Sequence, residues 1–193
     1  MSRAVEVHLR SFTYDGCREP VLRDTQFHLD YGQLTLLSGL SGCGKSTLLS
    51  LINGVIPRMT AGTLDGQVLV DGEDIAGRTM SQISRKVGCV LQNAESQIIH
   101  QSVEDEIAFG CENFGVDPAD IDQRIGDSCA RLGLERSWAT RTLSGGQKQR
   151  LVTASTLAMG ADILIFDEPL ANLDQSGDVL QGAQLPGGQP GLH

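Results

Sequence analysis

This 193-residue chain lacks features by which several classes of protein are recognised. No uninterrupted apolar run approaches the roughly 18 residues needed to cross a bilayer, and the N-terminal residues contain no signal-peptide core. The sequence therefore predicts no transmembrane helix. The five cysteines are scattered, odd in number and without a C-x-x-C pair, which argues against a disulfide framework or a metal site. We expect reduced, mostly buried thiols.

Cationic residues are also scarce. Lys and Arg total 15 against 24 Asp and Glu, a net charge of -9, so no general electrostatic attraction to nucleic acid is expected. The 40% of hydrophobic residues is enough for one domain with a substantial core, and this excludes disorder as a class for most of the chain.

One stretch has the pattern of a phosphate-binding loop. Residues 39–47 fit G-x-x-x-x-G-K-[ST], follow the strand-like apolar run 34–37 and lead into a helical pattern at 47–52. Glycines let backbone N–H groups close around phosphate oxygens, and the helix N-terminus adds positive potential. A bare glycine-rich turn explains neither the lysine nor the hydroxyl that follow. We expect a nucleotide to be bound by Gly39, Leu40, Ser41, Gly42, Cys43, Gly44, Lys45, Ser46 and Thr47.

Two of these residues have distinct chemical roles in the prediction. Lys45 is expected to neutralise charge on the β- and γ-phosphates, and the Ser46 hydroxyl to bind Mg²⁺.

The residues before the loop predict an antiparallel pair of strands. Val5, Val7 and Leu9 alternate with polar residues, and residues 22–29 alternate more loosely. Tyr14, close to the end of the first strand, is a candidate stacking platform for an adenine ring. A core or strand-end tyrosine explains it equally well from the residues alone.

A polar residue follows a short apolar strand pattern at 86–91. Gln92 would stand just past the end of that strand, where ligands bind in α/β sheets, although a solvated loop amide fits the position too. From Val103 to about Leu134 the pattern is helical, with a break at 115–118. The acidic run 104–106 is typical of a helix's first turn and solvated face. This region predicts a small helical insert.

A second glycine-rich helix start lies at residues 143–150. Ser144 is placed as an N-cap, and Gly145 and Gly146 leave the first N–H groups of the helix uncovered, which favours an anion. An ordinary capped helix explains the serine but not the paired glycines.

Two acids follow the apolar run 161–166, which is typical of a buried parallel strand. Adjacent carboxylates there are costly unless they meet cations or polar ligands. Asp167 is expected to hold Mg²⁺, and Glu168 to take the proton of an attacking water as general base. A strand merely stopped by acids is the alternative. Residues 181–193 are dominated by Gly, Pro and Gln, and we expect them to be disordered.

Together these motifs closely resemble those of ATP-binding cassette (ABC) ATPases. The matching segments are Gly39–Thr47 as Walker A, Gln92 as the Q-loop, Leu143–Gln147 as the LSGGQ signature, Ile163–Glu168 as Walker B and Ala171–Asp174 as the D-loop. The signature separates this family from other users of the phosphate loop. Residues 90–98, 103–110 and 112–116 resemble, more narrowly, the ATPase subunits of energy-coupling factor importers, which take up vitamins and transition-metal ions in prokaryotes. Residues 51–58 and 66–72 also resemble members in which two cassettes are fused.

The resemblance implies a fold and a set of ligands. The fold is α/β, a P-loop NTPase (RecA-like) core with an N-terminal antiparallel β subdomain and a helical insert that carries the signature. The ATPase domain would span residues 1–180, incomplete, with the helical subdomain at about 93–150. ATP and Mg²⁺ are the implied cofactors. Tyr14 would stack on adenine, Gln92 would act in catalysis with Glu168, and the metal ligands would be Ser46, Gln92 and Asp167.

The resemblance also implies partners. Members dimerise head to tail, so the implied partner is a second ABC ATPase subunit, identical or different. The ATP bound to that subunit would be contacted by Ser144, Gly145, Gly146 and Gln147 of this chain, and Asp174 would lie in the D-loop. ATP-driven dimerisation would power transmembrane transporter subunits from a peripheral position on the cytoplasmic face of the cell membrane. No nucleic acid partner is expected.

One departure from the family pattern concerns a switch histidine, which members carry well after the catalytic glutamate. The chain ends before that distance, and His8, His28, His100 and His193 do not match the position, so we expect weakened hydrolysis. Two alternatives stay open: a soluble ABC ATPase that acts on nucleic acid or ribosomes, and a truncated, non-catalytic fragment that binds nucleotide.

Overall fold

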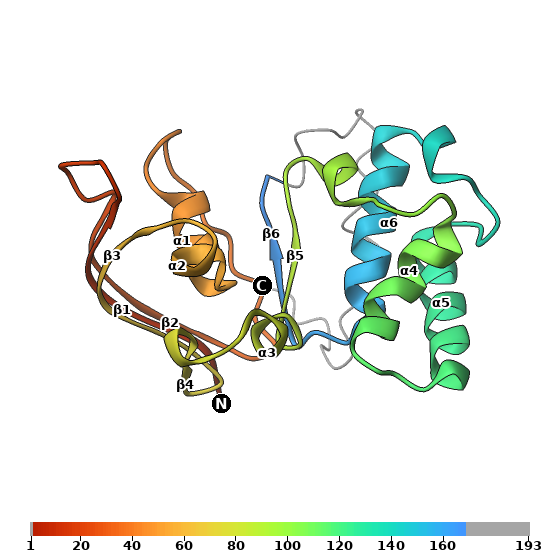
Figure 1. Cartoon of the computed structure of the whole chain (residues 1–193), viewed down its shortest axis with the longest axis horizontal. Helices are drawn as coiled ribbons and strands as arrows, with labels where there is room; N and C mark the ends of the chain where they lie inside the picture. Colours follow the sequence, from red (N-terminus) through yellow and green to blue (C-terminus); the bar gives the residue numbers. More distant parts are fainter. Residues whose placement is uncertain (1, 169–193) are drawn as a thin grey trace, which may run out of the picture. The chain divides into compact units, whose positions relative to one another are not determined.

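The computed structural model describes residues 2–168, and the chain divides into two compact units, Met1–Val87 and Gly88–His193 (Figure 1). Residues 169–193, which include Asp174 of the predicted D-loop, His193 and the glycine-rich tail predicted to be disordered, lie outside the described residues.

The first unit contains a four-stranded antiparallel sheet. Its strands are β1 (Arg3–Tyr14), β2 (Leu22–Asp30), β3 (Gly62–Val70) and β4 (Glu73–Asp74), in the order β2-β1-β3-β4. The alternation along β1 places Val5, Val7 and Leu9 in the core, and Val7 pairs with a residue of β2 on one side and of β3 on the other. The predicted antiparallel pair is confirmed.

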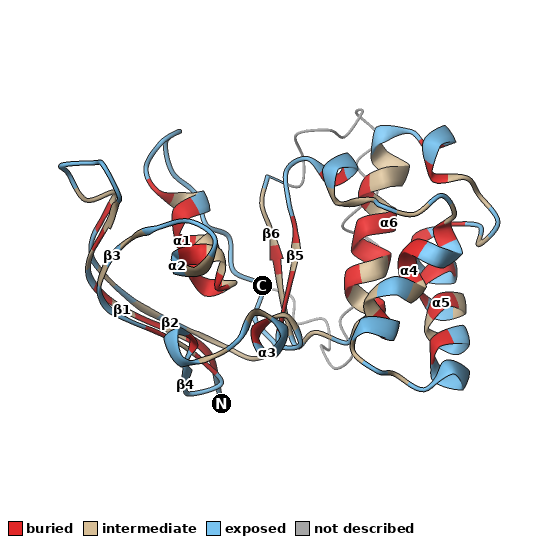
Figure 2. Ribbon diagram, viewed as in Figure 1, coloured by how far each residue is buried: buried red, intermediate tan, exposed pale blue. Residues whose placement is uncertain are grey.

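Helices pack on this sheet and complete the core of the first unit. Helices α1 (Lys45–Ile52) and α2 (Val55–Arg58) contact β3, and η1 (Ile75–Gly77) and α3 (Met80–Ser84) follow β4. Leu51 and Ile56 of the helices are fully buried, as is Phe12 of β1. Figure 2 shows the buried residues of α1 and of the sheet in red.

The strand predicted at residues 34–37 is wrong. These residues form no strand, and Leu34 and Leu36 are 95% and 89% exposed. A strand requires a neighbour that accepts and donates its backbone hydrogen bonds, and no described strand pairs with this run. Its apolar composition alone therefore does not fix its backbone.

The second unit combines a two-stranded sheet with helices. Strands β5 (Val87–Val90) and β6 (Ile163–Phe166) pair, and between them lie η2 (Ala94–Gln97), α4 (Val103–Asn113), α5 (Pro118–Leu132), η3 (Thr140–Thr142) and α6 (Gly145–Ala158). The predicted helical insert and its break are confirmed. The prediction that the last strand is buried is only partly correct, because Ile165 is buried while the other residues of β6 are half-buried.

Helix α6 packs against two apolar clusters of the second unit. Leu151, Ala154 and Ala158 join the cluster made with α4 and α5. Val152, one residue further round the helix, packs with Val90 and Ala94 beside the end of β5. Helix α6 therefore links the helical insert to the loop that carries Gln92.

All five cysteines are free, as predicted, but most are not buried. Cys111 and Cys129 are buried, and burial raises the pKa of both thiols. Cys17 and Cys43 are exposed, and Cys89 is intermediate. Within residues 2–168, no helix has the length and apolar character that a membrane span demands.

Candidate functional site

The backbone of the predicted phosphate loop adopts conformations that favour glycine. Gly42 and Gly44 have φ angles of 78° and 95°, in the left-handed region. A Cβ on Gly44 would lie 2.7 Å from Leu22 Cδ2 and 3.2 Å from the carbonyl oxygen of Val21. Residue 44 is also the N-cap of α1. Glycine is therefore required here both by the φ angle and by the space at the start of the helix.

The start of α1 has the properties of an anion site. No side chain caps the helix, and its first turn contains no acid. Lys45 Nζ donates hydrogen bonds to the carbonyl oxygens of Gly39 (2.8 Å) and Leu40 (2.9 Å), so the ammonium lies over its own loop. Ser46, an exposed residue with a hydroxyl side chain, follows the lysine along the chain. A helix N-terminus, a cation and a hydroxyl together fit a polyphosphate with its Mg²⁺.

Tyr14 lies beside this loop. Its hydroxyl is 2.8 Å from Thr47 Oγ1 in the first turn of α1, and its ring meets Phe12 edge to face, with ring centroids 4.9 Å apart. The structure thus brings the candidate adenine platform next to the candidate phosphate loop, although the two are 33 residues apart in the sequence.

In the second unit, the structure brings together the two residues predicted to act in catalysis. Gln92 Nε2 donates a 2.7 Å hydrogen bond to Glu168 Oε2. Glu168 has a φ of 50°, which is uncommon for a residue with a side chain. Such backbone conformations cluster at functional sites, so this one is consistent with the predicted role of Glu168.

Asp167 is fixed at the end of the strand pair. Its backbone N–H donates to the carbonyl oxygen of Val90 at 2.9 Å, which extends the pairing of β5 and β6 by one bond. Residues 2–168 contain no group of three His, Cys, Asp or Glu side chains that could hold a metal. Ser46 of the first unit, and Gln92 and Asp167 of the second, each carry an oxygen donor of the kind that Mg²⁺ prefers.

Gln97 is a residue that the sequence reasoning missed. Its side chain accepts a 2.8 Å hydrogen bond from the N–H of Leu91 and donates a 3.1 Å bond to the carbonyl oxygen of Cys89. Both bonds brace the backbone just before Gln92. No local pattern signals this role, because it depends on the turn η2 that folds residue 97 back onto β5.

Helix α6, which carries the predicted signature, begins with a capping box. Ser144 Oγ accepts from the N–H of Gln147 at 3.3 Å, and the Gln147 side chain accepts from the N–H of Ser144 at 2.8 Å. The predicted N-cap is therefore confirmed. A Cβ added to Gly146 would meet no atom within 4 Å. Packing within the described chain does not explain a glycine at this position.

An ion pair strengthens the link between α6 and the loop after β5. Lys148 Nζ lies 2.5 Å from Glu95 Oε1, close to the contact of Val152 with Ala94. The Gln92 loop and the start of α6 are thus held together by apolar packing and by charge.

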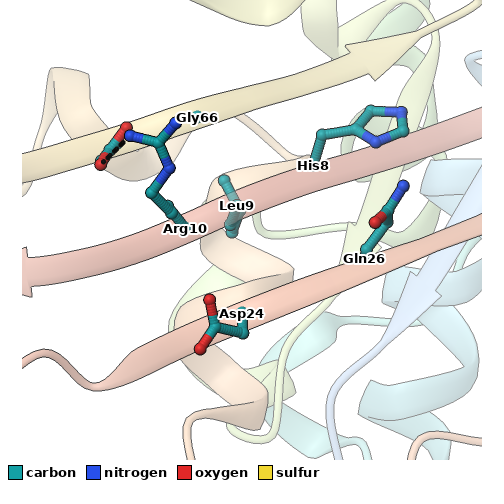
Figure 3. Close-up of a pocket in the computed structure, with 7 residues that line it drawn as sticks. His8, Leu9, Arg10, Asp24, Gln26 and Gly66 are labelled. Atoms are coloured by element: carbon teal, nitrogen blue, oxygen red, sulfur yellow. Dashed lines mark hydrogen bonds and ion pairs between the residues drawn. The ribbon is translucent and has the colours of Figure 1, made fainter.

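A separate shallow cavity of about 360 Å³ lies on the antiparallel sheet (Figure 3). Residues of β1, β2 and β3 line it, and Arg10 pairs with Asp65 across it at 3.4 Å. Close approach of the two backbones explains Gly66, since a Cβ there would lie 2.2 Å from the carbonyl oxygen of His8. None of the predicted site residues lines this cavity.

Comparison with known proteins places these motifs in a family. The family model described as "ABC transporter" matches residues 22–171. A protein of Methanosarcina acetivorans described as an ABC transporter ATP-binding protein is 41% identical over 175 residues, which are 90% of this chain and 27% of that protein. A Streptomyces coelicolor protein of the same description is 42% identical over 166 residues, 85% of this chain and 30% of that protein.

Solved structures agree with this assignment. CbiO1 of Clostridium perfringens, described as part of the ABC transporter complex CbiONQ, is 28% identical with a TM-score of 0.78, and the match covers 90% of this chain and 68% of CbiO1. A bacterial Atm1-family ABC exporter with ATP bound is 25% identical with a TM-score of 0.73, over 94% of this chain and 32% of the exporter. The predicted P-loop NTPase fold is thereby confirmed.

The chain spans about a third or less of the length of these curated relatives. The family model nevertheless matches well over half of this chain. The chain therefore belongs to the ABC transporter family, as an ATP-binding domain whose family hydrolyses ATP.

Proposed function

We propose that this chain is the ATP-binding and ATP-hydrolysing subunit of an energy-coupling factor importer. The observation that carries the ATP-binding part of this proposal is the phosphate loop, where the Lys45 ammonium lies over a helix start that no side chain caps and that follows two glycines of positive φ. A site of this kind favours a polyphosphate over a neutral ligand, because N–H groups, helix dipole and ammonium all stabilise negative charge.

The proposed chemistry assigns one role to each group. Lys45 binds the β- and γ-phosphates, and Ser46, Gln92 and Asp167 would hold Mg²⁺, which would neutralise charge on the phosphates. Glu168 accepts the proton of the attacking water. The Gln92 amide supports this last role, because it holds one carboxylate oxygen of Glu168 and leaves the other as the proton acceptor.

We further propose that two ATPase subunits pair on ATP. Ser144, Gly145, Gly146 and Gln147 would contact the ATP held by the partner's phosphate loop, and Asp174 would act in the D-loop. The open space beside Gly146 supports this assignment, because it leaves room for an external phosphate close to the helix start. ATP would favour the paired state, and hydrolysis would release it.

The importer role rests on two lines of support. The structural neighbour CbiO1 is described as part of a CbiONQ transporter complex, and residues 90–98, 103–110 and 112–116 carry the motifs that resemble importer ATPases. The partners would then be transmembrane transporter subunits, which the chain would drive from the cytoplasmic face of the membrane.

Calorimetry of MgATP binding tests the site. Lys45→Ala should weaken binding by about a hundredfold or more, because a cation that contacts phosphate directly is removed. Arg10→Ala is the matched control, since it removes a cation from the same unit but outside the loop. Equal affinities for Lys45→Ala and the unmutated chain would contradict the assignment.

Hydrolysis and pairing test the rest of the proposal. Glu168→Gln should bind ATP, turn it over at a far lower rate and accumulate as a dimer in light scattering with MgATP, because the amide keeps the shape and loses the base. Turnover at the unmutated rate would exclude Glu168 as the base. Hydrolysis stimulated by added DNA or RNA would instead favour an ABC ATPase that acts on nucleic acid.

A further inference from the structure

The contact between Tyr14 and Thr47 has a consequence beyond base stacking. Thr47 is only 8% exposed and lies in the first turn of α1. Buried threonines deeper in a helix bond the carbonyl four residues back, as Thr153 and Thr156 do in α6. Four residues before Thr47 the helix has not begun, and the hydroxyl is paired with Tyr14 at 2.8 Å instead.

The Tyr14 ring is fixed at two further points. Its edge-to-face contact with the fully buried Phe12 has an interplanar angle of 83°, and its backbone pairs with Gly62 of β3. Phe12 in turn requires that glycine, because a Cβ on Gly62 would lie 2.6 Å from Phe12 Cζ. The ring is thus held by the sheet on one side and by α1 on the other.

We propose that the hydroxyl bond between Tyr14 and Thr47 is a positioning contact that fixes the base platform relative to the phosphate loop. The inference rests on the proposed ATP-binding function and on the adenine-stacking role that the family resemblance implies for Tyr14. A phenylalanine would offer the same stacking face but no link to α1. With the link, one rigid arrangement presents both surfaces at once, and less freedom is lost when a ligand bridges them.

This role makes a prediction that separates positioning from simple structural support. A ligand with base and phosphates uses the relative placement of the two surfaces, whereas inorganic tripolyphosphate uses the loop alone. Tyr14→Phe should therefore weaken MgATP binding by roughly three- to tenfold, the effect of one hydrogen bond. It should change tripolyphosphate binding by less than about twofold, which lies within the scatter of a surface effect.

Two variants of Thr47 complete the experiment. Thr47→Ser keeps the hydroxyl and should retain the preference for ATP over tripolyphosphate. Thr47→Val removes the hydroxyl and should lower that preference, and Tyr14→Phe combined with Thr47→Val should lower it no further, because both changes break the same bond. Thermal melting of every variant shows whether the fold is kept.

The measurements also distinguish failure of this inference from failure of the proposed function. The positioning role would be overturned if Tyr14→Phe lost the same affinity for ATP as for tripolyphosphate. It would also be overturned if the two single changes lowered the preference for ATP additively in the double variant. An unmutated chain that binds both ligands equally would overturn it too, since Tyr14 would then contribute no base contact. If Lys45→Ala binds both ligands normally, the phosphate loop assignment itself is wrong.

Discussion

The buried carboxylate of Glu106 holds the segment between η2 and α4, and its removal should destabilise the second unit measurably. Glu106 Oε2 accepts hydrogen bonds from the backbone N–H groups of Ile99 (3.0 Å) and His100 (2.8 Å), and it lies 3.3 Å from His100 Nδ1. The Glu106 side chain is 7% exposed. Two consecutive N–H groups of this segment therefore depend on one buried oxygen.

The magnitude follows from these bonds. A hydrogen bond to a charged group contributes about 1.5–3 kcal/mol, and water can replace part of the loss because Ile99 is 63% exposed. We expect Glu106→Ala to lower the free energy of unfolding by about 2–4 kcal/mol. Glu106→Gln keeps an acceptor oxygen but loses the charge, and should cost about 1 kcal/mol.

The single tryptophan provides the assay. Trp138 packs against the apolar cluster of α4, α5 and α6, so its fluorescence in a urea titration reports on the second unit. With an m-value of about 2 kcal/mol/M, the middle of the usual range for urea, the midpoint for Glu106→Ala should fall by about 1–2 M. Glu104→Ala is the matched control, because that half-exposed carboxylate pairs with Arg136 at the surface and should matter by less than about 1 kcal/mol.

Two results would refute this reasoning. One is a Glu106→Ala midpoint that matches the unmutated chain. The other is an equal loss in Glu104→Ala, which would mean that helix charge rather than the buried carboxylate is responsible.

Three further changes have defined outcomes. Gly44→Ala should lower the melting temperature through a loss of about 1–3 kcal/mol, because its φ is 95° and the new Cβ meets Leu22. Hydrogen bonds from Lys86 and Tyr31 hold the pKa of Asp71 below its usual value, so its contribution to stability is present above the unfolded pKa and is lost as pH falls through the folded one. Asp71→Asn should therefore flatten the fall in melting temperature as the pH drops below about 5. Gly146→Ala should leave the free energy of unfolding unchanged or raise it by up to about 1 kcal/mol. Introduced into the Glu168→Gln variant, the same change should weaken ATP-driven pairing.

Each of these has a direct check. Melting curves at neutral pH decide the two glycine variants, and a Gly44→Ala chain as stable as the unmutated one would contradict the required backbone. Asp71→Asn is compared with Asp65→Asn, because the Asp65 carboxylate is half-exposed and pairs with Arg10 at 3.4 Å. If the melting temperatures of both variants fell identically with pH, the stabilising role of the Asp71 carboxylate would be contradicted. Light scattering with MgATP reads out pairing, and an undiminished dimer in Gly146→Ala would count against its contact with a partner.

Local patterns predicted the elements whose structure is decided locally. The alternation at Val5, Val7 and Leu9 gave β1 its buried face, and the Ser144 side chain capped α6 as its spacing to Gln147 predicts. These outcomes depend on side-chain direction along a strand and on one turn of helix. The strand predicted at Leu34–Leu37 was wrong because a strand needs a neighbouring strand to pair with, and the composition of the run does not supply one.

The contacts within the candidate site span long stretches of sequence and were not predictable from local pattern. Gln92 and Glu168 are 76 residues apart, and Tyr14 and Thr47 are 33 apart. Residue type and motif position predicted all four as site residues. Only the pairing of β5 with β6 brings Gln92 and Glu168 together, and only the packing of α1 near the end of β1 does so for Tyr14 and Thr47. Gln97 was missed for the same reason, since its bonds to the backbone of β5 arise from the fold of η2.

The two glycine-rich helix starts of this chain differ in what requires their glycines. At Gly44 the fold requires glycine, because φ is positive and Leu22 occupies the space where a Cβ would go. At Gly146 the φ is ordinary for a helix and the space is open, so alanine would fit and would favour the helix by up to about 1 kcal/mol. A residue that the fold does not require, and that weakens the helix it begins, is best explained by a partner that approaches the backbone from outside. In the proposed function that partner is the phosphate of an ATP held by a second subunit.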